Sequence, residues 1–187
     1  MNIKFSDDFT KVIEYSRGEA VRTGSYGLNV DHLMLGLLRH AGNEAVRTLT
    51  GLGVDVDSMK EYIDSRVFRE TPIPWSMADS VKMTRGAQSV LNMAAFEALK
   101  TGTHEISPIH LLLAISRTDG NATSEYLASK GIGSREISEK VRSVSPRGPV
   151  AGERGMETMR FEDVAGAIAE QIGNLAGSAA NDFKIPS

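Results

Sequence analysis

The 187-residue chain contains no cysteine and only one tryptophan, and aromatic residues make up 6% of it. Without cysteine it can form neither a disulfide framework nor a thiolate zinc site, and it has no cysteine nucleophile. No apolar run approaches the ~20 residues that a membrane-spanning helix needs. Acidic residues interrupt the N-terminal stretch where a signal peptide would be apolar. We therefore expect a soluble, cytoplasmic protein without membrane contact.

Strong positive charge is also missing, because 21 basic residues face 24 acidic ones, for a formal net charge of -3. A broadly basic surface for nucleic acid is therefore not expected. The motifs of common enzymes are absent as well: there is no Gly-Lys dipeptide for a phosphate-binding loop, no His-Glu-x-x-His and no nucleophile elbow. We predict a non-enzymatic protein with no cofactor and no metal. The composition, 41% hydrophobic and 24% charged, is typical of a folded domain or two small ones.

An internal repeat with an offset of 78 residues organises the chain. Residues 5–66 and 83–144 share 15 identities in 62 aligned pairs without a gap. The identities concentrate at glycines, helix caps and apolar positions, where two copies of one fold must agree. The matched pairs include Glu19 with Glu97, His32 with His110, Arg39 with Arg117, Asn43 with Asn121 and Gly53 with Gly131. We predict repeat one at 4–67, a connector at 68–81 and repeat two at 82–145, which together form one domain over 1–145.

Each repeat is predicted to form four short helices. A capping hydroxyl begins the first helix, at Ser6 or Thr84, and a glycine ends it, at Gly24 or Gly102. The second helix is apolar nearly all round, so we expect it to be the buried centre of its repeat. The second helix starts at Asn29-Val30 in repeat one and at Ser107-Pro108 in repeat two. The third helix starts at Asn43 or Asn121, and the fourth covers about 57–66 or 134–143.

The connector contains Pro72, Pro74 and Trp75, the only tryptophan of the chain. Two prolines in a stretch of mixed polarity predict a segment without helix. We expect Trp75 to pin this segment onto the helical body, and stacking on a ligand is the alternative.

Past residue 145 the repeat ends. Prolines and glycines predict a flexible linker at 146–155, and apolar residues at helical spacing then predict an amphipathic helix within the tail, 156–187. Three glycines weaken this helix, so it needs a surface to pack on. We expect it to dock on its own domain or on a second copy, which would make a homodimer, and a tether to another protein is the alternative.

The paired histidines, His32 and His110, stand at the start of the two central helices. Equivalent positions in a duplicated fold usually do equivalent structural work, and a metal site needs three or four ligands. We therefore predict that both rings bond to neighbouring turns. A metal-dependent enzyme that uses them is the alternative.

Taken together, the duplicated motifs resemble the Clp N-terminal (Clp R) domain of the Clp AAA+ unfoldases, of the ClpC or ClpA type. The motifs are Glu-Ala-x-x-x-Gly, His-Leu-x-Leu, Gly-Asn and Leu-x-x-x-Gly, in this order in both repeats. The resemblance implies an all-α fold of two pseudo-twofold-related four-helix repeats, to which this chain adds the C-terminal helix. It also implies a module that captures substrate proteins or adaptors for a Clp ATPase.

No ATPase module follows within the 187 residues, so we expect the module to act in trans. The front end of a longer unfoldase and a free-standing oligomeric regulator unrelated to proteolysis are alternatives.

Some members of the family bind phosphoarginine through a Thr-Glu-His triplet in each repeat. Here the triplets read Val30-Asp31-His32 and Pro108-Ile109-His110, so only Asp31 retains a carboxylate for a guanidinium group. Asp31 can equally be a favourable first-turn acid of the helix. The candidate peptide- or adaptor-binding residues are Asp31, His32, Ile109, His110, Ser6 and Trp75.

Overall fold

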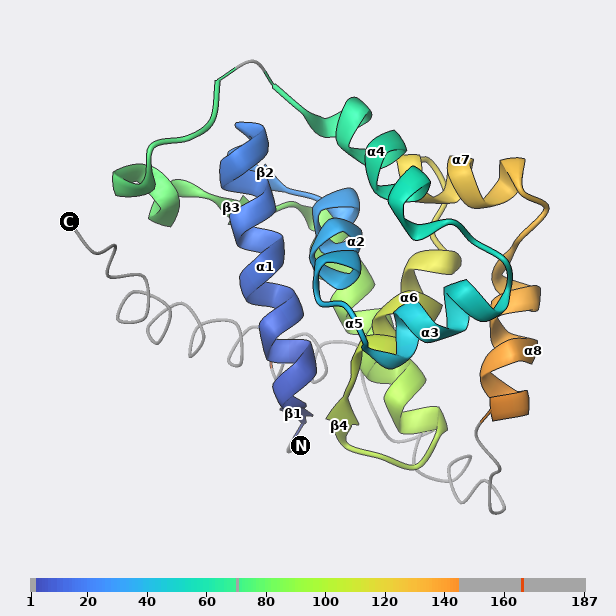
Figure 1. The fold of residues 1–187 in the computed structure, drawn as a ribbon. Coiled ribbons are helices and arrows are strands. Elements are labelled where there is room, and N and C mark those ends of the chain that lie inside the picture. Colours follow the sequence, from blue (N-terminus) through green and yellow to red (C-terminus); the bar gives the residue numbers. More distant parts are fainter. Residues whose placement is uncertain (1–2, 70, 145–165, 167–187) are drawn as a thin grey trace.

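The computed structural model describes residues 3–69, 71–144 and 166, and it confirms four helices in each repeat (Figure 1). The first repeat contains α1 (Asp7–Thr23), α2 (Val30–Arg39), α3 (Glu44–Gly51) and α4 (Val56–Val67). The second contains α5 (Arg85–Lys100), α6 (Pro108–Ser116), α7 (Ala122–Ser129) and α8 (Ser134–Val144). The predicted linker at 146–155 and, apart from Gly166, the tail at 156–187 lie outside the described residues.

Four two-residue strands, which the sequence did not predict, join the repeats. They are β1 (Lys4–Phe5), β2 (Gly27–Leu28), β3 (Lys82–Met83) and β4 (Glu105–Ile106). The strand β1 pairs in parallel with β4, and β2 pairs in parallel with β3. Since β3 is the repeat equivalent of β1, and β4 of β2, each repeat pairs its first strand with the second strand of the other. This exchange is the pseudo-twofold relation that the resemblance implied.

The central helices α2 and α6 are buried as predicted. In α2 every residue from Val30 to Leu38 is buried, and in α6 every residue from Pro108 to Ile115 is buried. Both helices contact elements of their own and of the other repeat, and together they form the centre of one hydrophobic core. The caps are also those expected: the side chain of Asn43 accepts a hydrogen bond from the Val46 amide, and that of Asn121 accepts one from the Ser124 amide.

Helices α1 and α2 approach each other closely at Gly36. A Cβ atom at this position would lie 2.2 Å from Ser16 Oγ and 2.6 Å from the Val12 carbonyl oxygen. The backbone of α1 cannot yield to such a contact without moving the helix. A side chain at position 36 is therefore incompatible with this packing.

We predict that Gly36→Ala lowers the free energy of unfolding by about 1–3 kcal/mol, because overpacking outweighs the gain in helix propensity of roughly 1 kcal/mol. Urea unfolding followed by circular dichroism measures the change. The control is Gly86→Ala in α5, where the nearest atoms to an added Cβ are 3.9 Å away. A Gly36→Ala chain at least as stable as the wild type would contradict the close approach.

Candidate protein-binding site

Asp31 bonds to the second repeat. Its carboxylate accepts hydrogen bonds from the Ala122 amide, the Thr123 amide and the Thr123 hydroxyl, each at 3.0 Å. These groups are at the N-terminus of α7, where free amides and the helix dipole favour an anion. Asp31 is only 8% exposed. Its carboxylate therefore caps a helix of the other repeat, and a binding role for it stays a prediction.

The ring of His32 is fixed at both nitrogens, as the structural interpretation predicted. The Asn29 amide donates to Nδ1 at 3.1 Å, and Nε2 lies 3.0 Å from the Thr23 hydroxyl, which donates to the Glu19 carbonyl at 2.8 Å. Because Nδ1 accepts, the neutral ring carries its proton on Nε2 and donates it to Thr23. This chain of bonds ties the start of α2 to the end of α1 and leaves neither nitrogen of His32 for a metal.

The second repeat reproduces this arrangement around His110. The Ser107 amide donates to its Nδ1 at 3.0 Å, and Nε2 lies 3.5 Å from the Thr101 hydroxyl. The equivalent of Asp31 is Ile109, a buried core residue of α6. Repeat one therefore caps α7 of repeat two with a carboxylate, and Ile109 cannot return such a cap to α3 of repeat one. Within the described part of the chain, no three side chains of the types His, Cys, Asp and Glu are grouped as metal ligands. The metal-dependent alternative therefore finds no support in the placement of the two histidines.

We predict that stability falls at mildly acidic pH because of His32. Burial of the ring lowers the pKa of His32 from 6.5 to about 4. The nearby Asp31 charge raises this pKa and the Arg22 charge lowers it, but both effects are smaller than that of burial. The unfolded chain therefore binds the extra proton between these values. The contribution of neutral His32 to the free energy of unfolding is therefore fully present above pH 6.5. As the pH falls toward 4, the free energy of unfolding decreases by about 3 kcal/mol.

Urea unfolding between pH 7.5 and 4.5 tests this, with His32→Gln as the variant whose pH dependence should be flatter. An NMR titration of the His32 ring in the wild-type chain provides a second measurement that does not depend on the variant folding. A ring pKa at or above 6.5 would contradict the prediction.

The connector is anchored on the end of α1 by its backbone and by Ile73. The Ile73 amide donates to the Val21 carbonyl at 2.9 Å, and the Arg69 amide donates to the Thr23 carbonyl at 2.7 Å. These carbonyls belong to the last turn of α1, where helical donors run out; the Val21 carbonyl also accepts from the Gly24 amide at 3.2 Å. Ile73 is 4% exposed, whereas Trp75 is 46% exposed. Ile73 is therefore the buried anchor of the connector, two residues before Trp75, the residue we expected to pin it.

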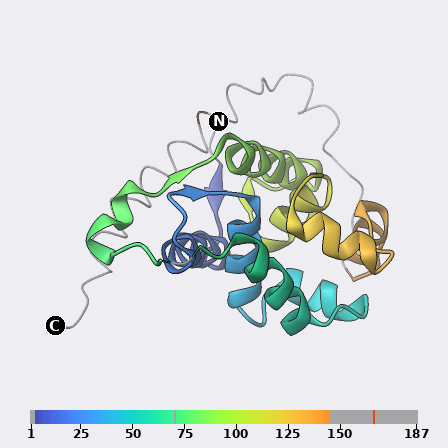
Figure 2. The same ribbon diagram turned by 90° about the horizontal axis from the view of Figure 1, so that it is seen from above.

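The connector also contains a short helix that the prolines did not predict. The 3-10 helix η1 (Trp75–Ser80) begins immediately after Pro74, whose carbonyl accepts from the Met77 amide at 2.8 Å. Proline is compatible with this position because it precedes the first helical residue and needs no amide donor. Figure 2 shows that η1 projects beside α1, on the side away from α7 and α8.

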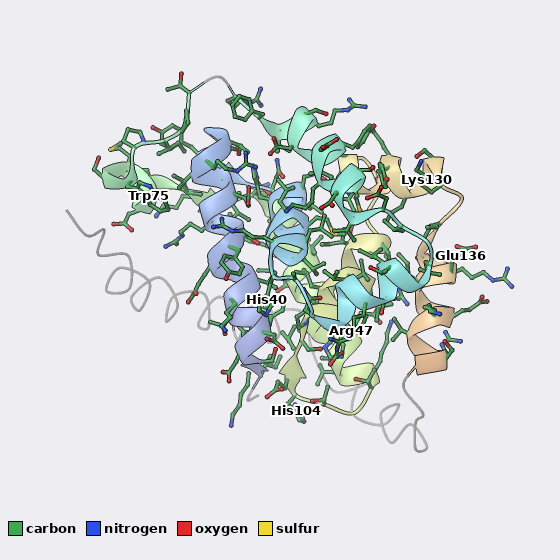
Figure 3. The ribbon with its side chains drawn as sticks, in the orientation of Figure 1. His40, Arg47, Trp75, His104, Lys130 and Glu136 are labelled. Carbon is green, nitrogen blue, oxygen red and sulfur yellow. The ribbon has the colours of Figure 1, made fainter. Side chains whose placement is uncertain are left out.

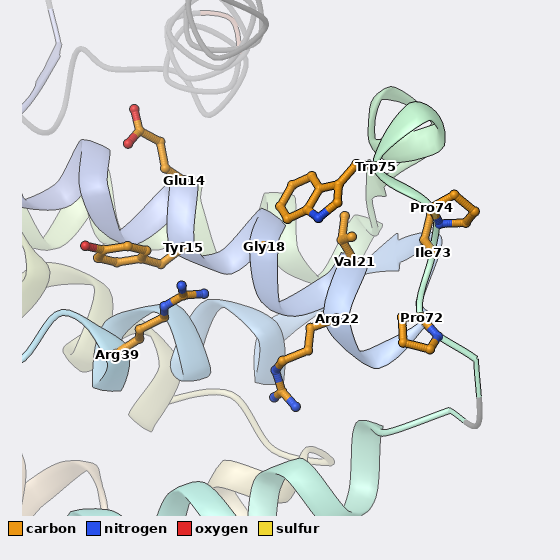
Figure 4. Close-up of a pocket in the computed structure, with 10 residues that line it drawn as sticks. All are labelled: Glu14, Tyr15, Gly18, Val21, Arg22, Arg39, Pro72, Ile73, Pro74 and Trp75. Carbon is orange, nitrogen blue, oxygen red and sulfur yellow. The ribbon is translucent and has the colours of Figure 1, made fainter. Parts of the chain in front are cut away.

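An open groove lies between α1 and the connector, with a volume of about 660 Å³ (Figure 4). Gly18 and Val21 of α1 form its floor, and the indole of Trp75 extends over them from the connector. The remaining lining residues are Glu14, Tyr15, Arg22, Arg39, Pro72, Ile73 and Pro74. The absence of a side chain at Gly18 leaves room for a ligand at this point. The groove can therefore accept an apolar segment next to two guanidinium groups.

The large apolar side chains that are most exposed in the described part of the chain come from the connector and from the α1–α2 loop. They are Tyr26, Phe68, Trp75 and Met77, with exposures of 51%, 49%, 46% and 44%. The Lys82 amide donates to the Tyr26 carbonyl, which holds the loop beside the end of the connector. We call these four residues the connector patch.

The two arginines that line the groove share one buried carboxylate, that of Glu19. Glu19 pairs with Arg22 at 2.6 Å and with Arg39 at 3.5 Å, while Asp64 also bonds to Arg22. The bond to Asp64, ahead of that to Glu19, raises the pKa of Arg22, so this guanidinium is charged at every physiological pH. The Arg39 group lies 4.8 Å from the Tyr15 ring centroid in a cation–π contact. Both arginine side chains remain nearly half exposed and have further N–H donors to offer.

The structure does not bring the six predicted binding residues together. Ser6 caps α1, its hydroxyl accepting from the Phe9 amide at 3.1 Å, and the Ser6 amide donates to the Ile106 carbonyl. Of the six, only Trp75 lines the groove. The binding role of the other five stays a prediction. The prolines and Trp75 were the sequence signal for this site, whereas Tyr15, Gly18 and Arg39 carried none.

Gly24 sets how closely the connector approaches α1. Its φ of 77° is left-handed, and an added Cβ would lie 2.2 Å from the Thr71 carbonyl oxygen. Its repeat equivalent, Gly102, has nearly the same φ of 79° but no atom within 4 Å of that position. The two glycines share the backbone requirement and differ only in the contact with the connector.

We predict that Gly24→Ala destabilises the fold more than Gly102→Ala. Both substitutions incur the left-handed strain of about 1–2 kcal/mol, and only the first displaces the connector. Urea unfolding measures the difference, expected to be at least about 1 kcal/mol. The emission of Trp75 should change in Gly24→Ala and not in Gly102→Ala. Equal losses of stability with unchanged emission would contradict the assignment.

The fold and the groove define a double-repeat helical domain with an open apolar binding surface. The chain belongs to the Clp repeat (R) N-terminal domain family, whose sequence pattern matches residues 4–130. It is 25% identical over 138 residues to the chaperone protein ClpB of Oceanobacillus iheyensis, a match that covers 74% of this chain and 17% of the relative. To the negative regulator of genetic competence ClpC/MecB of Bacillus subtilis it is 24% identical, over 74% of this chain and 16% of the relative. The chain thus spans about one-sixth of the length of these curated relatives.

Solved structures of the family share the fold. The N-terminal domain of the chaperone ClpD from Arabidopsis thaliana gives a TM-score of 0.59 at 17% identity, covering 75% of this chain and 93% of that domain. The Hsp104 N-terminal domain from Candida albicans gives 0.63 at 14% identity, covering 79% and 95%. Helices long and apolar enough to cross a membrane are absent from the described residues.

Proposed function

We propose that this chain is a protein-binding module, without catalytic activity of its own, that captures substrate proteins or adaptors for a Clp unfoldase. The observation that carries the proposal is the connector patch beside the groove. Exposed apolar side chains next to a groove commonly mark an interaction site, and Trp75 lines the groove with Met77 two residues further along η1. Trp, Tyr and Met are also enriched where proteins bind one another.

The groove supports recognition of an apolar segment more than of a small polar ligand. Its floor is the apolar surface of α1 at Gly18 and Val21, and Trp75 offers an indole that is still 46% exposed. Covering a side chain of this size contributes roughly 1.5–3 kcal/mol. Arg22 and Arg39 add charged donors at the edge, which can orient a segment through its carbonyl or carboxylate groups.

Family membership supports the connection to Clp ATPases. The relatives are chaperones and a regulator named ClpB and ClpC/MecB, and the matched region is a small part of each. We propose that the module can act in trans on a Clp ring, as an adaptor or as a competitor for substrates. A cytoplasmic location stays a prediction from the sequence.

We predict that Trp75→Ser combined with Met77→Ser weakens binding of fluorescein-labelled, unfolded β-casein by about fivefold or more, because the patch loses its largest apolar contacts. Fluorescence anisotropy with the full chain measures the affinity. The control is Lys130→Ser, at the C-terminal end of α7, far from Trp75 (Figure 3). Circular dichroism verifies that the variants are folded.

Equal affinity of the wild type and the patch variant would contradict the use of this surface. Action in trans is tested by adding the full chain to a purified ClpC-type ATPase with its peptidase and following casein degradation. The proposal expects the wild type to change the rate and the patch variant to leave it unchanged. A rate that neither chain alters would contradict action in trans.

A further inference from the structure

Two apolar surfaces of this chain are tethered to each other. One is the groove with the connector patch, which is exposed in the described residues. The other is predicted from the sequence of residues 156–181, beyond the end of α8. In that segment apolar residues recur at helical spacing: Phe161, Val164, Ile168, Ile172 and Leu175. Placed on a helix, they form one stripe, which is stable in water only when it is covered.

We propose that residues 156–181 dock into the groove between α1 and the connector of the same chain. The inference rests on the proposed function, since it assigns an internal competitor to the same site. While the segment is docked, it covers Trp75 and excludes substrate or adaptor, so the module binds partners only when the segment is displaced. The tail is then an autoinhibitory element rather than a dimerisation helix.

The length of the tether permits this docking. Helix α8 ends at Val144, and residues 145–155 separate it from the segment. Eleven extended residues reach ~35 Å, close to the diameter of a compact domain of about 140 residues, whose radius of gyration is ~14 Å. A link of this length gives an effective concentration of about 1 mM, so even a weak contact within the chain is occupied. A second copy at micromolar concentration competes poorly with it.

Charge favours the same placement. Residues 156–181 contain one arginine and four acidic residues, a net charge of -3. The groove offers the guanidinium group of Arg39, whose side chain is 47% exposed while its partner Glu19 is 10% exposed; Arg22, 45% exposed, is already paired with both Glu19 and the 35% exposed Asp64. A carboxylate of the segment therefore meets the accessible donors of Arg39 beside a sheltered acid. Glu14, also on the groove, opposes this attraction and orients the acidic side of the segment away from itself.

The absence of cysteine makes a direct test possible, because every introduced cysteine is unique. We combine Ala169→Cys, beside the apolar stripe, with Glu14→Cys on the groove. The control combines Ala169→Cys with Lys130→Cys, on the far side of the domain from Trp75 (Figure 3). Lys130 is closer in sequence to the tail, so tethering alone favours the control. Full-length chains are oxidised at low micromolar concentration, and non-reducing gels separate cross-linked monomers from dimers.

We expect the Glu14 pair to form a disulfide within the chain about tenfold faster than the Lys130 pair, given the difference in effective concentration. Adding Ile168→Asp and Ile172→Asp should abolish this preference. The matched control, Asn174→Asp with Asn181→Asp, adds the same two charges to the polar side and should preserve it. Equal rates for the two pairs would overturn the proposal. Covalent dimers in place of cross-linked monomers would also overturn it and would assign the segment to a second copy.

Casein binding separates this inference from the proposed function. The variant with Ile168→Asp and Ile172→Asp should bind labelled β-casein about threefold or more tightly than the wild type, since the internal competitor is weakened. Its Trp75 emission should shift to longer wavelength as the indole becomes exposed. A fast Glu14 cross-link with no casein binding by any chain would support the docking and contradict the proposed function. Casein binding that depends on Trp75, without a preferred cross-link, would contradict the docking alone.

Discussion

The exchange of strands between the repeats determines most of the remaining structure. Pairing of β2 with β3 requires the chain to return from the end of α4 to the side of Tyr26, where the Lys82 amide donates to the Tyr26 carbonyl at 2.9 Å. This path leads past the last turn of α1, whose carbonyls at Thr23 and Val21 accept from the Arg69 and Ile73 amides. The groove is the space left between that path and α1. Its position is thus a consequence of how two repeats close into one domain.

The two repeats agree where the backbone needs support and differ where function is proposed. Both fix their central helix by a histidine between a cap and a threonine, and both hold a buried glutamate, Glu19 or Glu97, between two basic side chains. Only repeat one is crossed closely by the connector, as the contact of Gly24 with Thr71 and the open space at Gly102 show. The connector wall of the groove is therefore a feature of repeat one that the duplication of the fold does not repeat at Gly102.

The sequence predicted what depends on local or periodic signals. Caps, terminating glycines and the apolar second helices specified the eight α-helices of the described residues, and the repeat specified their pairing. The four strands could not be predicted, because a strand of two residues is too short to show an alternating hydrophobic pattern. The bond from Asp31 to Ala122 and Thr123 joins residues 91 and 92 positions apart, which no local pattern encodes. Trp75 indicated where the site lies, but its exposure was not predicted. Its size and hydrophobicity suggested that it would be the buried residue of the connector, whereas the smaller Ile73 is buried instead.

Both walls of the groove are attached to α1. One wall is α1 itself, which His32 ties to α2 through Thr23, and the other is held by backbone bonds from Ile73 and Arg69 to carbonyls of α1. A small shift between the repeats therefore moves the two walls together and leaves the separation of Trp75 from Gly18 unchanged. Loss of the bonds to Val21 and Thr23 would instead free the connector while the core stays intact. Binding at this site should consequently depend on the end of α1 more than on the stability of the whole domain.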